Sequence, residues 1–367
     1  MWMRTTLENI MLAVGPWSME DPDVTIKEFK IDHIPTRIYI PHNRSSDGAI
    51  IYIHGGGFVL GTMDMYESVI REIVRRTKTV EVLLRIAKFY SRFFKMLFQI
   101  AFSMDYRLAP EHVFPAALDD CEQMVLHVLQ HGCLEYGINK SRVVLMGDSA
   151  GGGLIASLTY RLRNRQDIMQ PKLQVLIYPL VQIHNLRTPS YEYFYRVMSG
   201  TGFVDPRLIA QYYLMYAGVD DDMNEEMTRQ ALDNEHMSKQ TRYTVQRYVD
   251  LRLIPRSLRY GRNITAWKQK YSEETSRRLL PLLLNPEFSP IVQPDLSRVP
   301  PALVVTMEHD ILRDEGILYA RRLLKAGVPT TWKHFSTGFH AMLNFHAILP
   351  SSERVVTYIS DWTRDHI

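Results

Sequence analysis

The chain has 367 residues, of which 46% are hydrophobic and 23% charged, values typical of a soluble globular protein. Lysine and arginine total 43 against 40 aspartates and glutamates, so the net charge of +3 does not favour nucleic acid as a partner. Two cysteines, Cys121 and Cys133, exclude a disulfide-stapled scaffold, no Cys/His spacing predicts a metal site, and no run of about 18 apolar residues predicts a membrane-spanning helix.

Along the chain, short apolar runs alternate with segments of helical periodicity. The mostly continuous apolar runs predict strands buried on both faces: Ala49–Ile53, Ala101–Tyr106, Val143–Met146, Leu173–Tyr178, Ala302–Met307 and Thr330–Phe335. The helical segments are Met65–Thr77, Pro115–His131, Gly152–Arg163, Glu315–Ala326 and Ser352–Arg364. Because strands alternate with helices, we expect a single α/β domain over residues 1–367, with a mostly parallel twisted sheet and helices on both faces.

The alternation breaks over about residues 184–300, which contain helix-like pieces, Tyr-rich segments and charge runs. A connection this long between two strands is either a lid over the C-terminal edge of the sheet or a disordered insertion. The aromatic content favours the lid.

The strongest chemical motif is Gly147-Asp148-Ser149-Ala150-Gly151, directly after a predicted strand and directly before a predicted helix. Glycines two residues before and after the serine permit a tight strand-to-helix turn that exposes the hydroxyl, as in a nucleophile elbow. The N-terminus of the following helix directs backbone amides at any anion that forms there. The competing interpretation is a tight turn without a catalytic role.

A second motif, His54-Gly55-Gly56-Gly57, follows the first predicted strand. Its bare backbone allows amides to approach a substrate oxygen, whereas a phosphate-binding loop would need a different glycine spacing. We therefore expect an oxyanion hole from the Gly55–Gly57 loop, chiefly the amides of Gly56 and Gly57, together with the amide of Ala150. His54 is expected to stabilise the loop by hydrogen bonding and not to act as a base.

An acid and a base follow downstream in the chain order Ser, Asp, His. Asp310 ends one predicted strand and His340 lies just past the last one, so both are expected at the C-terminal edge of the sheet beside Ser149. The competing acids are Glu308, inside the strand, and Asp314, which resembles a helix N-terminal residue.

Five motifs then occur in a characteristic order: HGGGF, DYRLAPEHVFPAALDD, GDSAGGG, HDILRDEG and TGFHAML. Together they resemble the hormone-sensitive-lipase family of α/β hydrolases, and the middle section with SPIVQPDLSRVPPALVV is most similar to the subgroup of arylacetamide deacetylase and neutral cholesterol ester hydrolase. The resemblance implies an α/β-hydrolase fold and a serine carboxylesterase without metal or cofactor, with Ser149, Asp310 and His340 as triad. It implies lipophilic ester or amide substrates, including lipids, and a supporting role for Asp105–Glu111 and Asp148.

The N-terminal part departs from this family pattern. Family members carry a signal anchor and cap helices before the HGGG loop, so the resemblance implies a lid from residues 1–35 as well as 184–300, and a place at the endoplasmic reticulum membrane or lumen. No anchor is visible in this sequence, which leaves a soluble cytoplasmic protein or a truncated chain as alternatives.

A second departure is Glu81–Gln99, where basic and apolar residues recur at steps of three and four. This pattern predicts a basic amphipathic helix. Three interpretations stay open: contact with a membrane surface, an ordinary packed helix, and an insertion that is dispensable for the chemistry.

Other functions also stay open. A small-molecule receptor on a hydrolase scaffold would be expected to lack a triad member, which this sequence does not. An inactive product would follow if the insertion or the N-terminus prevented folding. A peptidase is disfavoured because no second domain is present to gate peptides.

Overall fold

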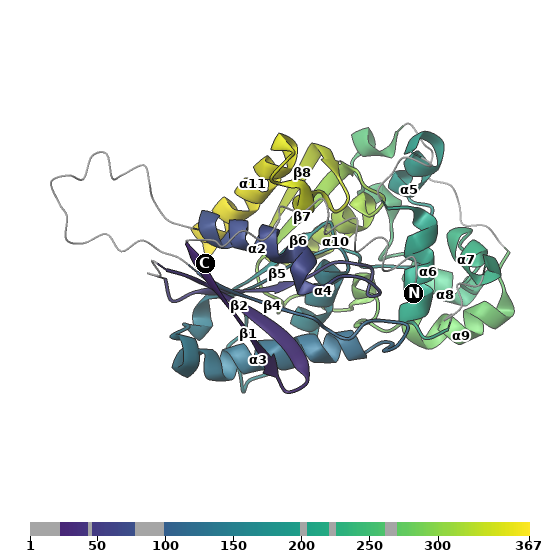
Figure 1. Cartoon of the computed structure of the whole chain (residues 1–367). Helices are drawn as coiled ribbons and strands as arrows, with labels where there is room; N and C mark the ends of the chain where they lie inside the picture. The colour runs from purple at the N-terminus through teal and green to yellow at the C-terminus, as the bar shows by residue number, and fades with distance from the viewer. Residues whose placement is uncertain (1–22, 43–45, 78–98, 199–203, 220–224, 261–269) are drawn as a thin grey trace.

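The computed structural model describes residues 23–42, 46–77, 99–198, 204–219, 225–260 and 270–367. Its centre is an eight-stranded sheet in the order β1-β2-β4-β3-β5-β6-β7-β8, in which β1, β2 and β4 pair antiparallel and the remaining neighbours pair parallel (Figure 1). The strands are β1 (Val24–Ile31), β2 (Ile34–Pro41), β3 (Ala49–Ile53), β4 (Ile100–Met104), β5 (Val143–Asp148), β6 (Leu173–Ile177), β7 (Ala302–His309) and β8 (Thr330–Phe339).

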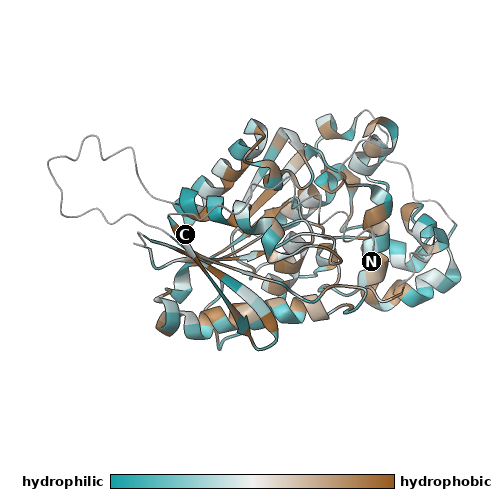
Figure 2. Ribbon diagram, in the orientation of Figure 1, coloured by the Kyte–Doolittle hydropathy of each residue, from teal (hydrophilic) through white to brown (hydrophobic). Residues whose placement is uncertain are grey.

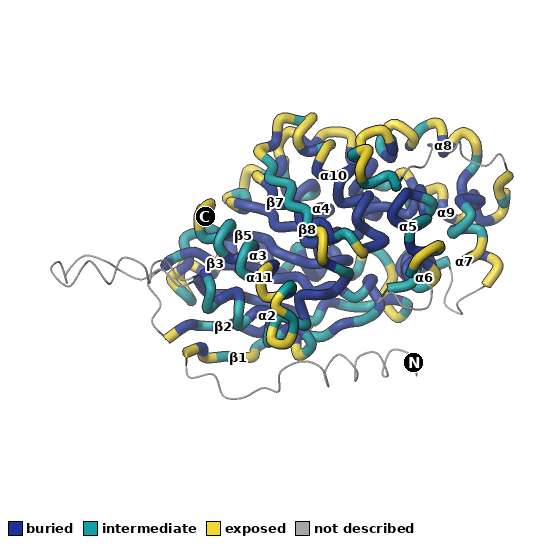
Figure 3. Tube along the Cα trace, turned by 90° about the horizontal axis from the view of Figure 1, so that it is seen from above, coloured by how far each residue is buried: buried dark blue, intermediate teal, exposed yellow. Residues whose placement is uncertain are grey.

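Helices cover both faces of this sheet, and hydrophobic residues on each helix turn toward it (Figure 2). One face packs α2 (Met63–Arg76) and α11 (Pro350–His366); the other packs α3 (Ala116–Tyr136), α4 (Ala150–Leu162) and α10 (Arg313–Lys325). In β3, Ile50 and Tyr52 belong to the core on the side of α2 and α11. Ile51 and Ile53 belong to the core on the opposite side, as the two-residue period of a strand requires. The expected α/β-hydrolase architecture is confirmed, and Figure 3 shows its central strands buried.

Residues 184–300 contribute a block of helices at the C-terminal end of the parallel strands, hereafter the helical block (Figure 1). It comprises α5 (Pro189–Tyr193), α6 (Pro206–Tyr216), α7 (Glu225–Leu232), α8 (Lys239–Val245) and α9 (Glu273–Leu283). Short helical turns connect elements here and elsewhere: η1 (Lys140–Arg142), η2 (Phe194–Met198), η3 (Leu251–Leu253), η4 (Arg256–Arg259), η5 (Pro290–Val292) and η6 (Met342–Phe345).

The N-terminal part differs from the expectation of a lid over residues 1–35. Residues 24–31 and 34–41 form the antiparallel hairpin β1–β2, which extends the sheet beyond β4. The sequence does not clearly predict these strands, because Lys27-Glu28 break the two-residue alternation of β1, only the two ends of β1 are buried, and β2 contains prolines. Residues 1–22 lie outside the described residues, as does the predicted amphipathic segment except for Gln99, which is buried next to β4.

The two ends of the helical block are joined to each other at the sheet. The carbonyl of Leu283, the last residue of α9, accepts a hydrogen bond from Nε2 of the buried His184 at 2.7 Å. Val181, just after β6, accepts from the amide of Ile291 at 3.0 Å and donates its own amide to the buried Glu315 at 2.6 Å. The segment that leads from β6 into the helical block and the segment that leads out of it are therefore joined by hydrogen bonds. Within the described ranges, none of the helices is long and apolar enough to cross a membrane.

The first turn of α4 approaches the end of β3 more closely than a side chain would allow. A Cβ atom on Gly151 would lie 2.0 Å from the carbonyl oxygen of Ile53, and one on Gly147 would lie 2.5 Å from the same oxygen. Both distances are below any real Cβ contact, so only glycine is compatible with this packing.

We expect Gly151→Ala to push α4 away from β3 and to lower the free energy of unfolding by about 1–3 kcal/mol, because overpacking strains a close-packed interior. Urea denaturation measures this change. Gly132→Ala in α3 is a matched control, since its Cβ would meet side-chain atoms, the nearest being the flexible end of Ile138 at 3.0 Å, and not a backbone carbonyl. Equal stabilities of the two variants would contradict this account of the contact.

The buried His184 should make the protein acid-sensitive. Burial lowers the pKa of its imidazole from 6.5 to about 4. As pH falls through this window the unfolded chain takes up a proton that the folded protein excludes, so stability falls. His184→Gln should be less stable at neutral pH, yet lose roughly 3 kcal/mol less free energy of unfolding between pH 7 and pH 4. Urea titrations at both pH values test this, and parallel pH profiles would contradict it.

Candidate active site

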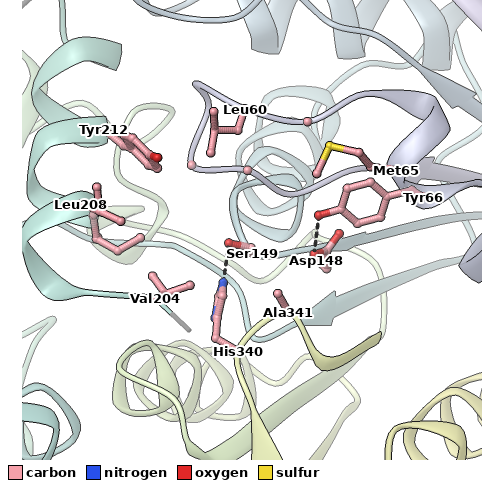
Figure 4. A pocket seen from close by; sticks show the side chains of 14 residues that line it. Leu60, Met65, Tyr66, Asp148, Ser149, Val204, Leu208, Tyr212, His340 and Ala341 are labelled. Atoms are coloured by element: carbon pink, nitrogen blue, oxygen red, sulfur yellow. Dashed lines mark hydrogen bonds between the residues drawn. The ribbon is translucent and has the colours of Figure 1, made fainter. Parts of the chain in front are cut away.

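Ser149 lies at the sharp turn between β5 and α4. Its backbone has φ 52° and ψ −122°, a strained conformation for a residue with a side chain. The surrounding chain fixes this conformation: the Ser149 amide donates to the carbonyl of Ile177 at 2.9 Å, and its carbonyl accepts from the amide of Leu180 at 3.0 Å. The turn therefore presents the Ser149 hydroxyl above the sheet edge, as the glycine spacing predicts (Figure 4).

Three predicted residues meet there in a hydrogen-bonded row. Oγ of Ser149 lies 2.9 Å from Nε2 of His340, and Nδ1 of His340 lies 3.0 Å from both carboxylate oxygens of Asp310. A carboxylate can only accept, so Nδ1 carries the proton and Nε2 is left to accept from the serine hydroxyl. All three side chains are buried.

Strand register explains how Asp310 and His340 come together. They follow β7 and β8 directly, and the last paired residues of these strands are His309 and Phe339, after a register shift that begins at Met307. Asp310 follows His309 and His340 follows Phe339, so the two catalytic candidates extend from the same strand pair. The Asp310 carboxylate is oriented further by the amide of Leu312, which donates to it at 2.8 Å.

The competing acids have other partners. Glu308 accepts from His334 at 2.8 Å and from the hydroxyl of Tyr260 at 2.5 Å. Asp314, in the first turn of α10, is fully buried against Arg313 and accepts from the amide of Ser190 at 2.7 Å. Neither carboxylate faces the imidazole of His340, so both have structural roles.

The Gly55–Gly57 loop only partly matches the expected oxyanion hole. The Gly55 amide donates to Asp148 at 3.0 Å, so the assignment of Gly55 as a donor to substrate is wrong. Gly56 and Gly57 have positive φ angles of 119° and 64°, and their amides donate to no other described residue. Ala150 is the first residue of α4, where amide groups lack partners within the helix. The amides of Gly56, Gly57 and Ala150 therefore remain available to donate to an oxyanion.

Asp148 anchors the loop from the sheet side. Its buried carboxylate accepts from Gly55 and also from the hydroxyls of Tyr52 at 3.0 Å and Tyr66 at 3.2 Å. Burial raises its pKa to about 6, and the three hydrogen bonds oppose this rise because they favour the charged form. Neither tyrosine was predicted from the sequence. The only signal was the polar hydroxyl of Tyr52 within the otherwise apolar strand β3.

His54 stabilises the same loop, as predicted. Its Nδ1 donates to the carbonyl of Gly55 at 2.7 Å, and its ring stacks on Tyr106 with centroids 4.3 Å apart. Burial lowers the pKa of this imidazole to about 4. Tyr106 in turn donates to the His54 carbonyl at 3.0 Å, and Asp105 accepts from the amide of Met63 at 2.6 Å, so the Asp105–Glu111 segment supports the loop.

A mostly apolar pocket opens in front of Ser149 and His340 (Figure 4). It contains about 710 Å³ of empty space, part of which is open to solvent. One wall comes from the helical block and the other from the loop and helix that follow β3. The apolar and aromatic lining residues are Leu60, Met65, Tyr66, Val204, Leu208, Ile209, Tyr212 and Ala341. Sequence patterns did not identify these residues, because tertiary packing brings them together. Among the described residues, no cluster of three or more histidine, cysteine or acidic side chains could hold a metal ion.

Comparisons with known sequences agree with this geometry. A family model described as alpha/beta hydrolase fold matches residues 85–279 and 266–344. Rat arylacetamide deacetylase is 30% identical over 336 residues, covering 88% of this chain and 76% of its own length. Rat neutral cholesterol ester hydrolase 1 is 29% identical over 357 residues, covering 93% of this chain and 79% of its own.

Solved structures show the same fold. An esterase from the archaeon Pyrobaculum calidifontis superposes with a TM-score of 0.67 at 26% identity, covering 99% of this chain and 92% of its own. A thermostable carboxylesterase from a metagenomic library, at 23% identity, superposes with a TM-score of 0.70 over 100% of this chain and 96% of its own. The chain belongs to the hormone-sensitive-lipase family of α/β hydrolases, as a distant relative of arylacetamide deacetylase and neutral cholesterol ester hydrolase.

Proposed function

We propose that this protein, a carboxylesterase-type hydrolase by family, cleaves ester or amide bonds of lipophilic small molecules or lipids through an acyl-enzyme formed on Ser149. The observation that carries the proposal is the continuous row from Ser149 through His340 to Asp310 at the floor of an apolar pocket. The names of the relatives, a deacetylase and a cholesterol ester hydrolase, support the substrate class.

In the proposed mechanism, Oγ of Ser149 attacks the substrate carbonyl carbon while Nε2 of His340 takes the hydroxyl proton. Asp310 orients the imidazole and stabilises its positive charge. The carbonyl oxygen becomes an oxyanion that accepts hydrogen bonds from the amides of Gly56, Gly57 and Ala150. His340 then returns the proton to the departing alcohol or amine, and the acyl group stays on Ser149.

Water completes the cycle. His340 removes a proton from the water molecule as it attacks the acyl carbonyl, and the second tetrahedral intermediate uses the same amides. Its collapse breaks the bond to Oγ, His340 returns the proton to Ser149, and a carboxylic acid leaves. The reaction needs only side chains and backbone groups of this chain.

From the resemblance of the sequence motifs to the arylacetamide deacetylase subgroup, we also propose a location at the endoplasmic reticulum membrane or lumen. Fluorescence microscopy of a tagged full-length chain beside compartment markers tests this proposal, and a diffuse cytoplasmic signal would contradict it.

Ser149 is the proposed nucleophile. A fluorophosphonate probe should label the folded protein, and Ser149→Ala should abolish labelling and lower kcat for p-nitrophenyl acetate by at least about 10³-fold, because an alanine cannot form the acyl-enzyme. Circular dichroism of both samples shows whether each is folded.

Two results would overturn the proposal. A folded natural protein that is neither labelled nor active toward p-nitrophenyl esters of any acyl length would instead support a small-molecule receptor on a hydrolase scaffold. Equal labelling of Ser149→Ala would show that another nucleophile reacts.

Asp148 anchors the Gly55–Gly57 loop through Gly55. Asp148→Asn keeps the size of the side chain but replaces one acceptor oxygen by an NH2 group. Gly55 and Tyr52 donate to one carboxylate oxygen and Tyr66 donates to the other, so the amide oxygen can accept at only one of these two positions. We expect kcat to fall about 10-fold or more with a smaller change in KM, because the loop acts on the transition state. Tyr66→Phe, which removes one donor, should cost less. A normal kcat in Asp148→Asn would argue against the anchoring role.

A further inference from the structure

Helix α6, which forms one wall of the pocket, also contacts the Gly55–Gly57 loop, hereafter the oxyanion loop. In α6, Leu208, Tyr212 and Tyr216 follow each other at steps of four and therefore share one face of the helix. Leu208 and Tyr212 line the pocket, and Figure 4 shows both on the side of Ser149 opposite Met65 and Tyr66. The face of α6 that meets substrate is thus continuous with the face that meets the loop.

The contact between Tyr212 and Gly57 is direct. A Cβ atom built on Gly57 would lie 2.3 Å from Cδ2 of Tyr212, with two further ring atoms at 3.1 and 3.2 Å. The ring therefore packs against the α-carbon of a pocket-lining residue whose amide is a proposed oxyanion donor. Gly57 has a φ of 64°, so its peptide depends on its surroundings to hold this conformation.

The next residue of the loop is held by the same helix. Phe58 is buried, has a positive φ of 67°, and stacks on the ring of Tyr216 with centroids 4.0 Å apart and an interplanar angle of 9°. Its carbonyl accepts from the amide of Ala109 at 2.9 Å. The outer side of the loop thus rests on α6, whereas Asp148 holds Gly55 on the inner side.

We propose that Tyr212 is a positioning residue for the oxyanion hole: its ring sets the Gly57 amide, so the helix that contacts substrate also controls the catalytic step. The proposal rests on the esterase function proposed above. Because an amide misplaced by a fraction of an ångström stabilises the oxyanion less well, loss of the ring acts on kcat even for substrates too short to reach α6.

The test compares the natural protein with Tyr212→Ala, Tyr212→Phe and Leu214→Ala, using p-nitrophenyl acetate as the short substrate. Leu214 is a fully buried residue of the same helix that does not line the pocket, so its variant reports any general loosening of α6. We expect kcat to fall 10- to 100-fold in Tyr212→Ala with little change in KM, and to recover most of this loss in Tyr212→Phe. Leu214→Ala should keep kcat within about twofold.

A double-mutant cycle with Gly57→Ala gives a second measurement. The added methyl group collides with the ring of Tyr212, so its effect on kcat should shrink at least threefold when Tyr212 is alanine, whereas independent sites would multiply. The proposal is overturned if Tyr212→Ala keeps a normal kcat, if Leu214→Ala loses as much, or if the cycle shows no coupling. Fluorophosphonate labelling of the natural protein tests the esterase function separately from these outcomes.

Discussion

The proposed catalytic arrangement depends on the close backbone contact between the carbonyl of Ile53 and the glycines on either side of Ser149. β3 and β5 are parallel neighbours; the first continues into the Gly55–Gly57 loop and the second into the serine turn. Because no side chain separates the two turns, the amides and the nucleophile lie beside each other. Such an approach needs residues without Cβ atoms, which explains why glycines gather here.

The oxyanion loop is held from two sides by different forces. On the sheet side, a buried carboxylate binds Gly55 through a charge-assisted hydrogen bond, which is directional and strong in a low-dielectric interior. On the outer side, aromatic rings of α6 hold Gly57 and Phe58 by van der Waals packing and ring stacking. The helical block is therefore more than a cover over the pocket, since it forms part of the support on which the loop geometry rests.

Sequence patterns predicted strands β3 to β8 and the five helices that flank the sheet. They also predicted the row from Ser149 to Asp310, because motifs at the ends of parallel strands must converge at one edge. Sequence patterns failed where the structure of a segment depends on the residues that it contacts in the fold. β1 breaks the two-residue alternation at Lys27-Glu28 and β2 contains prolines, so the strand character of the hairpin depends on the pairing of β1 with β2 and of β2 with β4. Gly55 was misassigned because only the folded chain shows its amide bound to Asp148.

The hairpin also bears on association between molecules. Among the described strands, β1 pairs only with β2 and lies at the edge of the sheet. An open edge of this kind can recruit a strand from another copy and start aggregation. Here exposed Lys27, Glu28 and Lys30 crowd the edge with charge. Charged side chains on an edge strand, lysines above all, disfavour the addition of a strand from another molecule.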